Sequence, residues 1–172
     1  MTTQPRPHPV ELSDADLLAA CEVRRLRRSG PGGQNRNKVE TAVQLVHHET
    51  GLVAEANERR SQAENRKVAL RRLRRQLALA VRVPHVPGAS PSTLWQGRCR
   101  EGKVSVNPDH ADFPRLLAEA LDHLAAVEWD APVAADGLGC TTSQLVKLLV
   151  LEPRALALVN RERAGRGLRR LY

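Results

Sequence analysis

Apolar and polar residues alternate in three short stretches between residues 22 and 56, which predicts three strands. The first, residues 22–27, alternates with many charged positions, so we expect an exposed strand at the edge of a sheet. The second and third, residues 41–47 and 52–56, are separated by Glu49, Thr50 and Gly51. Glycine suits the positive φ of a tight turn, so these two strands are expected to form a hairpin.

Helical spacing of apolar residues predicts one short helix before the strands and one long helix after them. Ser13, with Asp16 three residues later, predicts an N-cap for a helix that ends near Cys21. Ser61 and Glu64 have the spacing of a capping box, and the helix that they open runs to about Val81. We expect its apolar stripe of leucines to pack on the sheet; the stripe consists of Leu70, Leu73 and Leu77.

The rest of the chain is predicted to be helical, with helices at residues 113–126, 142–151 and 153–163. Thr141 and Gln144 can form a capping box, and Pro153 fits a first helical turn. Three short helices with glycines in one turn resemble a helix-turn-helix in outline. Residues 95–106 allow two interpretations: a short strand pair about Glu101 and Gly102, or a small basic contact.

These elements predict an α+β fold of two parts. Residues 1–12, rich in proline, are expected to be a flexible arm. Residues 13–82 form a small domain with a short sheet and a long C-terminal basic helix, residues 83–107 a linker, and residues 108–172 a small all-α domain with a basic tail.

Charge is concentrated in the first of these parts. The net charge is +8, and residues 1–82 hold 16 Lys/Arg against 9 Asp/Glu. The first half is therefore the expected nucleic-acid face. Residues 103–153 hold 3 basic against 8 acidic residues, which favours a structural or protein-docking domain over a DNA reader. Only four aromatic residues are present, which argues against an RNA reader that stacks bases on aromatic side chains.

A glycine-rich loop, Ser-Gly-Pro-Gly-Gly-Gln at residues 29–34, lies between the first two predicted strands. Its glycines allow positive φ and a close approach of the backbone to a partner, and arginines on both sides favour an anionic one. The loop is not a P-loop, because Lys38 lies between Asn37 and Val39 rather than in Gly-Lys-Ser/Thr. It is not a nucleophile elbow either, because Ser29 precedes the glycines.

The loop is followed by Asn35-Arg-Asn-Lys38, Val39 to Val43, His47, Thr50-Gly51, Arg60-Ser-Gln62 and Asn65. In this order the residues from about Glu22 to Leu77, about a third of the chain, resemble the catalytic domain of class I peptide chain release factors. Two positions depart from that family: Arg28, where a small residue is usual, and Arg36, where valine or isoleucine is usual. Neither lies within the Gly-Gly-Gln itself.

The resemblance implies hydrolysis of the ester that joins a nascent peptide to tRNA in the ribosomal peptidyl-transferase centre. The catalytic residues would be Gly32, Gly33 and Gln34. A glutamine amide cannot act as a general base. The resemblance assigns to the Gln34 main-chain N–H the stabilisation of developing charge, and to its side chain the shaping of a space for water.

Polar and basic residues around the loop and on the long helix are the expected contacts to rRNA or tRNA. They are Arg27, Arg28, Ser29, Arg36, Asn37, Lys38, Arg60, Ser61, Gln62, Asn65, Arg66, Lys67, Arg71 and Arg74. The long helix has seven basic residues from Arg66 to Arg82, and Glu64 is the one acidic residue in residues 63–82. This excess of positive charge favours contact with phosphates.

Full-length release factors carry a codon-reading region before this domain, whereas about 20 residues precede it here. The sequence therefore predicts a codon-independent peptidyl-tRNA hydrolase of the ribosome-rescue type, with the large ribosomal subunit, its 23S-type rRNA and peptidyl-tRNA as partners. Such relatives usually end in a flexible, very basic tail, and this chain departs from them in residues 108–172. The alternatives are a non-hydrolytic ribosome- or tRNA-binding factor whose residues 108–172 recruit a protein, and a helix-turn-helix regulator.

The remaining composition predicts neither metal nor cofactor. Cys21, Cys99 and Cys140 form no Cys-x-x-Cys pair, and the six histidines show no His-Glu-x-x-His. No run of 18 apolar residues and no secretory or organellar leader pattern occurs, so we expect no membrane contact and a cytoplasmic location.

Overall fold

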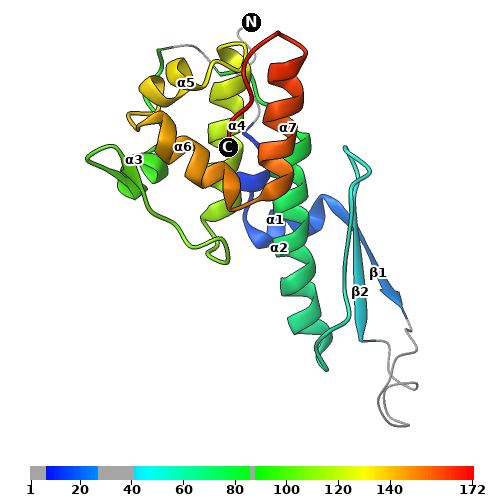
Figure 1. Ribbon diagram of the computed structural model, residues 1–172. Helices are drawn as coiled ribbons and strands as arrows, with labels where there is room; N and C mark the ends of the chain where they lie inside the picture. The colour runs from blue at the N-terminus through cyan, green and yellow to red at the C-terminus, as the bar shows by residue number, and fades with distance from the viewer. Residues whose placement is uncertain (1–6, 27–40, 86–87) are drawn as a thin grey trace, which may run out of the picture. The chain divides into compact units, whose positions relative to one another are not determined.

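A computed structural model describes residues 7–26, 41–85 and 88–172 (Figure 1). The chain divides into two compact units. The first, Pro9–Leu77, is called the sheet unit below; the second runs from Ala78 to Tyr172, includes His8, and is called the helical unit. The α+β fold that the sequence predicts is confirmed, although the division lies before residue 82, inside the long helix.

The sheet unit contains an antiparallel sheet of three strands in the order β1-β2-β3. Its strands are β1 (Cys21–Leu26), β2 (Ala42–His47) and β3 (Val53–Ala56). Gly51 takes a φ of 67° in the turn between β2 and β3, and the Thr50 hydroxyl lies 2.9 Å from Nδ1 of His47. The predicted hairpin is confirmed. Strand β1 is exposed along most of its length, as its charged alternation predicts.

The long helix α2 (Gln62–Ala80) packs on one face of this sheet. Pairing of Val43 with Ala56 and of Leu45 with Ala54 puts these four buried side chains on the same face. On α2 the predicted stripe of Leu70, Leu73 and Leu77 is buried. Burial of each such side chain contributes about 1.5–3 kcal/mol.

The N-terminal residues of the sheet unit are more ordered than predicted. Helix α1 (Asp14–Ala19) begins at the predicted cap, where the Ser13 hydroxyl accepts a hydrogen bond from the Asp16 N–H at 3.1 Å. In place of a flexible arm, Pro9–Glu11 form a 3₁₀ turn, η1, in which Val10 is 1% exposed. An apolar side chain within a polar stretch is enough to fix these residues against the core.

Three helices of the helical unit lie where the sequence predicts them. They are α4 (Phe113–Ala126), α6 (Thr142–Val150) and α7 (Pro153–Ala164). The Thr141 hydroxyl accepts from the Gln144 N–H at 3.3 Å, and Pro153 occupies the first turn of α7. A fourth helix, α5 (Ala131–Gly137), was not predicted.

The predicted linker, residues 83–107, is largely part of the helical unit. It contains helix α3 (Thr93–Arg98) and the strand pair β4 (Cys99–Arg100) and β5 (Lys103–Val104). Of the two interpretations of this stretch, the strand pair about Glu101 and Gly102 is confirmed. Trp95 is 1% exposed, and its indole N–H donates to the Leu138 carbonyl at 2.7 Å, which ties α3 to the end of α5.

Buried titratable groups gather where residues 81–85 meet α4. Arg82 Nη1 lies 3.0 Å from the Asp122 carboxylate, and the Val83 N–H donates to the same oxygen at 3.2 Å. Burial raises the pKa of Asp122 to about 6, although Arg82 opposes this shift. The rings of His85 and His123 are 3.6 Å apart, and burial lowers the pKa of His123 to about 4.

We predict that His123 makes the helical unit less stable as pH falls from 6.5 towards 4. In this window the unfolded chain protonates His123 while the folded chain does not, so acid favours unfolding. His8, whose pKa is lowered by burial, acts in the same direction, and Asp122 acts in the opposite one. The measurement is denaturant unfolding of wild type and His123→Phe at several pH values.

Subtracting the two unfolding free energies removes the contributions of His8 and Asp122, because both proteins contain them. The expected result is that wild type loses stability relative to His123→Phe as pH falls from 6.5 to 4.5. A difference that stays constant over this range contradicts the prediction.

Candidate functional site

The Gly-Gly-Gln segment joins two paired strand ends of the sheet unit. Leu26, the last residue of β1, is the register partner of Ala42, the first residue of β2. Residues 27–40 connect these two ends and lie outside the described residues. Nine of the predicted site residues belong to that segment: Gly32, Gly33, Gln34, Arg27, Arg28, Ser29, Arg36, Asn37 and Lys38. The described sheet therefore fixes both ends of the segment side by side.

Asn65, in the first turns of α2, holds the C-terminal end of this segment in place. Its side chain is 0% exposed, and its amide donates to the Thr41 carbonyl at 2.7 Å and to the Arg59 carbonyl at 2.9 Å. Its side-chain oxygen accepts from the Arg59 N–H at 2.8 Å. Asn65 was predicted to contact RNA, but a buried amide with these bonds cannot reach it. It positions the start of β2 instead.

Four predicted contact residues at the start of α2 and along it are exposed. They are Arg60, Ser61, Lys67 and Arg71. Lys67 and Arg71 are four residues apart and so lie on one face of the helix. Neither forms an ion pair with a carboxylate of the described residues. Gln62 is partly exposed beside them. The arrangement presents donors and positive charge to an anionic partner.

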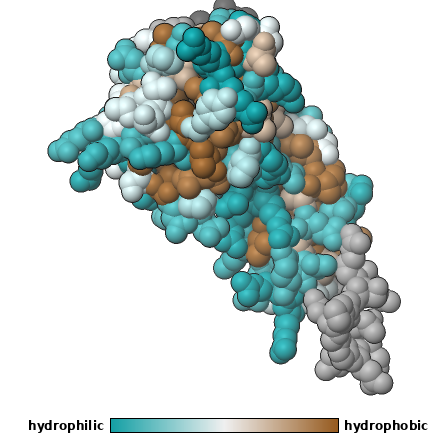
Figure 2. All heavy atoms as spheres, viewed as in Figure 1, coloured by the Kyte–Doolittle hydropathy of each residue, from teal (hydrophilic) through white to brown (hydrophobic). Residues whose placement is uncertain are grey.

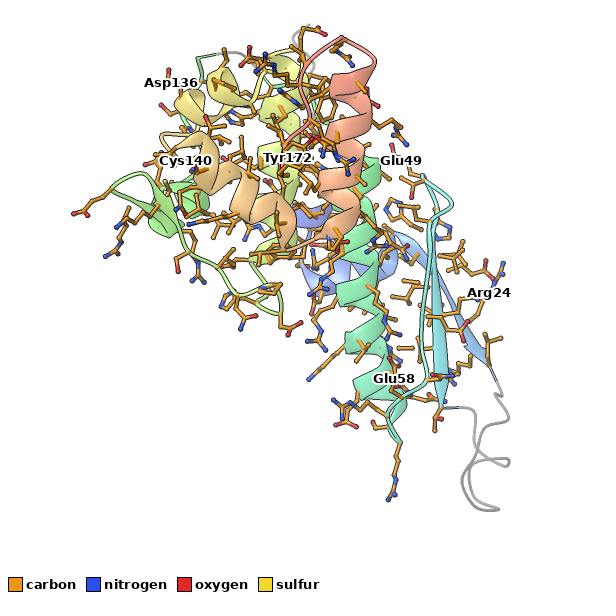
Figure 3. The ribbon with its side chains drawn as sticks, in the orientation of Figure 1. Arg24, Glu49, Glu58, Asp136, Cys140 and Tyr172 are labelled. Carbon is orange, nitrogen blue, oxygen red and sulfur yellow. The ribbon has the colours of Figure 1, made fainter. Side chains whose placement is uncertain are left out.

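Other basic residues of α2 bind within the sheet unit. Arg74 donates to the Val10 carbonyl at 2.6 Å and pairs with Asp14 at 2.8 Å. Arg72 pairs with Glu58 and donates to the Glu55 carbonyl at 2.5 Å. Arg74 was predicted to contact RNA, and the structure gives it a different role, fastening η1 and α1 to α2. Figure 3 shows Glu58 beside the end of α2 at which the helix begins.

A hollow of about 540 Å³ on the sheet unit adds a residue that the sequence did not single out. It is lined by Leu18, Val23, Arg25 and Arg66. Arg66, a predicted contact, has its Nε buried without a hydrogen-bond partner among the described residues. Arg25 is exposed on β1 opposite Val43. The alternation of β1 places Arg25 on the same face as Val23, but only the fold brings Arg66 of α2 to the same hollow.

The described part of the site is suited to binding rather than to proton transfer. Arginine and lysine bind phosphate oxygens, but none of these exposed side chains is a general base near neutral pH. Within residues 7–26, 41–85 and 88–172, no three His, Cys, Asp or Glu side chains are placed to hold a metal ion. None of the helices in these ranges is long and apolar enough to cross a membrane.

We predict that Asn65→Ala lowers the free energy of unfolding by about 1–3 kcal/mol, because backbone groups at Thr41 and Arg59 lose their partner. Urea denaturation provides the measurement. Asn57→Ala is the matched control, since Asn57 is exposed and should change stability by less than about 0.5 kcal/mol. Equal effects of the two substitutions contradict this role of Asn65.

The similarity of this chain to known proteins lies in the sheet unit and the start of the helical unit. The family model of the RF-1 domain matches residues 10–87. Peptide chain release factor 1 of Chlorobaculum tepidum is 46% identical over 68 residues, which are 40% of this chain and 18% of that protein. Peptide chain release factor 1 of Myxococcus xanthus is 40% identical over 68 residues, which are again 40% of this chain and 18% of that protein. Human mitochondrial peptide chain release factor 1 is 43% identical over 74 residues, which are 43% of this chain and 16% of that protein.

The chain thus spans less than a fifth of the length of these relatives. The matched residues contain the Gly-Gly-Gln segment, the three strands and all of α2. Residues 88–172 lie outside the RF-1 match. Residues 10–87 therefore match the RF-1 domain, the Gly-Gly-Gln-containing domain of class I release factors, and are similar in sequence to peptide chain release factor 1.

Proposed function

We propose that the chain hydrolyses the peptidyl-tRNA ester on stalled ribosomes without reading a stop codon. The observation that carries the proposal is the position of Gly32-Gly33-Gln34 in an RF-1 domain, between strand ends that Leu26 and Ala42 hold opposite each other. The matched relatives are peptide chain release factors by name. The partners in this proposal are the peptidyl-transferase centre with its 23S-type rRNA and peptidyl-tRNA.

The chemistry needs a donor for the charge that develops at the ester, and the backbone can supply it. The main-chain N–H of Gln34 is assigned this role, and the Gln34 side chain shapes the space for the attacking water. Gly33 allows the backbone of this donor to come close to the ester, because it carries no Cβ. Ribosomal RNA and tRNA contribute the rest of the reaction centre in this mechanism.

The fixed ends of the segment, at Leu26 and at Thr41 to Ala42, support the role assigned to the Gln34 N–H. A donor stabilises a transition state only if it is held in place before the reaction. The β1–β2 register fixes both ends of the segment, and Asn65 fixes the residue that precedes β2. The exposed cations Lys67 and Arg71 on α2 are assigned to RNA phosphates near these ends.

We predict that Gly33→Ala lowers the rate of peptide release by about a hundredfold or more, the usual effect of losing one preorganised donor. Gln34→Pro, which removes the N–H, should have an effect of the same size, and Gln34→Ala, which keeps it, a smaller one. The measurement is release of labelled formyl-methionine from ribosomes with an empty A site.

The same assay tests codon independence by comparing ribosomes that carry a stop codon, a sense codon or no codon in the A site. Equal rates on all three support the proposal, and release confined to stop codons contradicts it. Ribosome binding measured in parallel provides the control. If wild type binds ribosomes but releases nothing above background on any complex, the chain is a non-hydrolytic binding factor.

We predict that Lys67→Ala/Arg71→Ala weakens ribosome binding and lowers the slope of log K against log salt by about 2, about 1 for each lost phosphate contact. The matched control is Arg100→Ala/Lys103→Ala, which removes the same charge from two exposed residues of the helical unit. Sedimentation with ribosomes over a range of salt concentrations measures both. The same slope change in both double variants indicates a general charge effect and overturns the assignment.

A further inference from the structure

An apolar groove of about 740 Å³ runs along α6 in the helical unit. Its lining comes from α6, from residues 104–106 after the β4–β5 turn, and from the C-terminal residues 170–172. Val150 is 48% exposed and Leu151 41%, although both are large apolar residues. Figure 2 shows apolar side chains gathered on this face over α6, and Figure 3 places Tyr172 beside them.

Buried polar side chains hold the C-terminal wall of the groove in position. The Asn160 amide donates to the Leu171 carbonyl at 3.0 Å, and its oxygen accepts from the Leu171 N–H at 2.8 Å. Arg163, 6% exposed, donates to the Arg169 carbonyl at 2.8 Å and to the Trp129 carbonyl at 2.5 Å. These bonds fix the backbone at Arg169 and Leu171 along the groove, while the Tyr172 side chain is 90% exposed.

The part of the lining that contains Val104 and Val106 is joined to the residues before α6. The Thr141 N–H donates to the Gly102 carbonyl at 3.3 Å, and the Cys99 thiol lies 3.4 Å from the Gly139 carbonyl. These contacts join the β4–β5 turn to the loop between α5 and α6. A groove with two anchored walls is a preformed site, and preformed sites lose less conformational entropy on binding.

The groove carries positive charge. Its lining contains two cations and no Asp or Glu: Lys147 lies within residues 103–153, which are acidic overall, and Arg170 lies within the basic tail. Neither cation pairs with a carboxylate among the described residues, and Arg170 lies over the Tyr172 ring at 5.9 Å. Two uncompensated positive charges beside an apolar floor are complementary to acidic groups beside apolar ones.

We propose that this groove binds an amphipathic segment of a partner protein, with apolar side chains on the groove floor and Asp or Glu against Lys147 and Arg170. The apolar floor of the groove favours a peptide over a nucleic acid as the ligand. Phosphates would satisfy the two cations, but they would leave Val150 and Leu151 exposed to water, whereas apolar side chains of a peptide would cover both. This inference does not depend on hydrolysis by the RF-1 domain.

The test is selection of a random 16-residue peptide library, displayed on phage, against the full chain. The expected result is enrichment of peptides that combine apolar residues with Asp or Glu. The strongest peptide, labelled with a fluorophore, is then measured by anisotropy against wild type and variants. Val150→Asp should weaken binding of this peptide at least tenfold. Lys147→Glu/Arg170→Glu should weaken its binding similarly, and this variant should bind more tightly to a copy of the peptide in which Lys replaces each Asp and Glu.

Val133→Asp is the matched control, because Val133 is 52% exposed on α5 and does not line the groove. It should leave the affinity within about twofold of wild type. The proposal is overturned by a lack of enrichment, by enrichment of basic peptides, or by equal losses of affinity in Val133→Asp and Val150→Asp. It is also overturned if a 16-nucleotide RNA or DNA oligomer binds through Lys147 and Arg170 independently of Val150. A concentration-dependent dimer that Val150→Asp dissociates assigns the groove to a second copy of the chain and also overturns it.

Discussion

The three hydrogen bonds of Asn65 set the geometry on which the candidate site depends. They join α2 to residues 41 and 59, which lie 24 and 6 positions away in the chain. An unpaired backbone group in a buried place costs about 1–3 kcal/mol, so Thr41 and Arg59 are held where this amide can satisfy them. Because Thr41 directly follows residues 27–40, the same bonds determine where the Gly-Gly-Gln segment ends. A buried amide in α2 thus serves the site without touching a substrate.

The elements that the sequence predicts well are those set by local pattern. The β2–β3 hairpin follows from alternation around Gly51, and α2 from the spacing of Leu70, Leu73 and Leu77. Helices α3 and α5 were missed because they have six and seven residues, contain Gly97 and Gly137 respectively, and offer too few turns for a periodic signal. What stabilises them is distant: the Trp95 indole reaches Leu138, 43 residues away. Such a contact has no signature in a single sequence.

The predicted site shows the same division between local and distant information. Asn65 was assigned to RNA because the resemblance places it in the motif at the start of the long helix, and Arg74 because it is one of the basic residues of that helix. Their actual partners, Thr41 and the Val10 carbonyl, come from segments 24 and 64 residues away. Arg25 was not predicted as a site residue, because the hollow that it shares with Arg66 of α2 forms only in the folded chain. Residue type and spacing identify which side chains can bind an anion, and the fold decides which of them remain available.

The ion pairs distinguish basic residues that are bound within the fold from basic residues that can bind a partner. Arg72, Arg74 and Arg82 each have a carboxylate partner within their own unit, which offsets the cost of holding them near other positive groups. Lys67 and Arg71 have no carboxylate partner among the described residues, and like charges four residues apart on a helix cost about 0.2–0.5 kcal/mol. The same holds in the helical unit for Lys147, which lies in the acidic segment 103–153, and for Arg170 in the basic tail: neither pairs with a carboxylate of the described residues. In each unit, two of the cations that have no carboxylate partner among the described residues lie on the surface assigned to a partner, so the binding of an anionic group there would remove a cost that folding leaves in place.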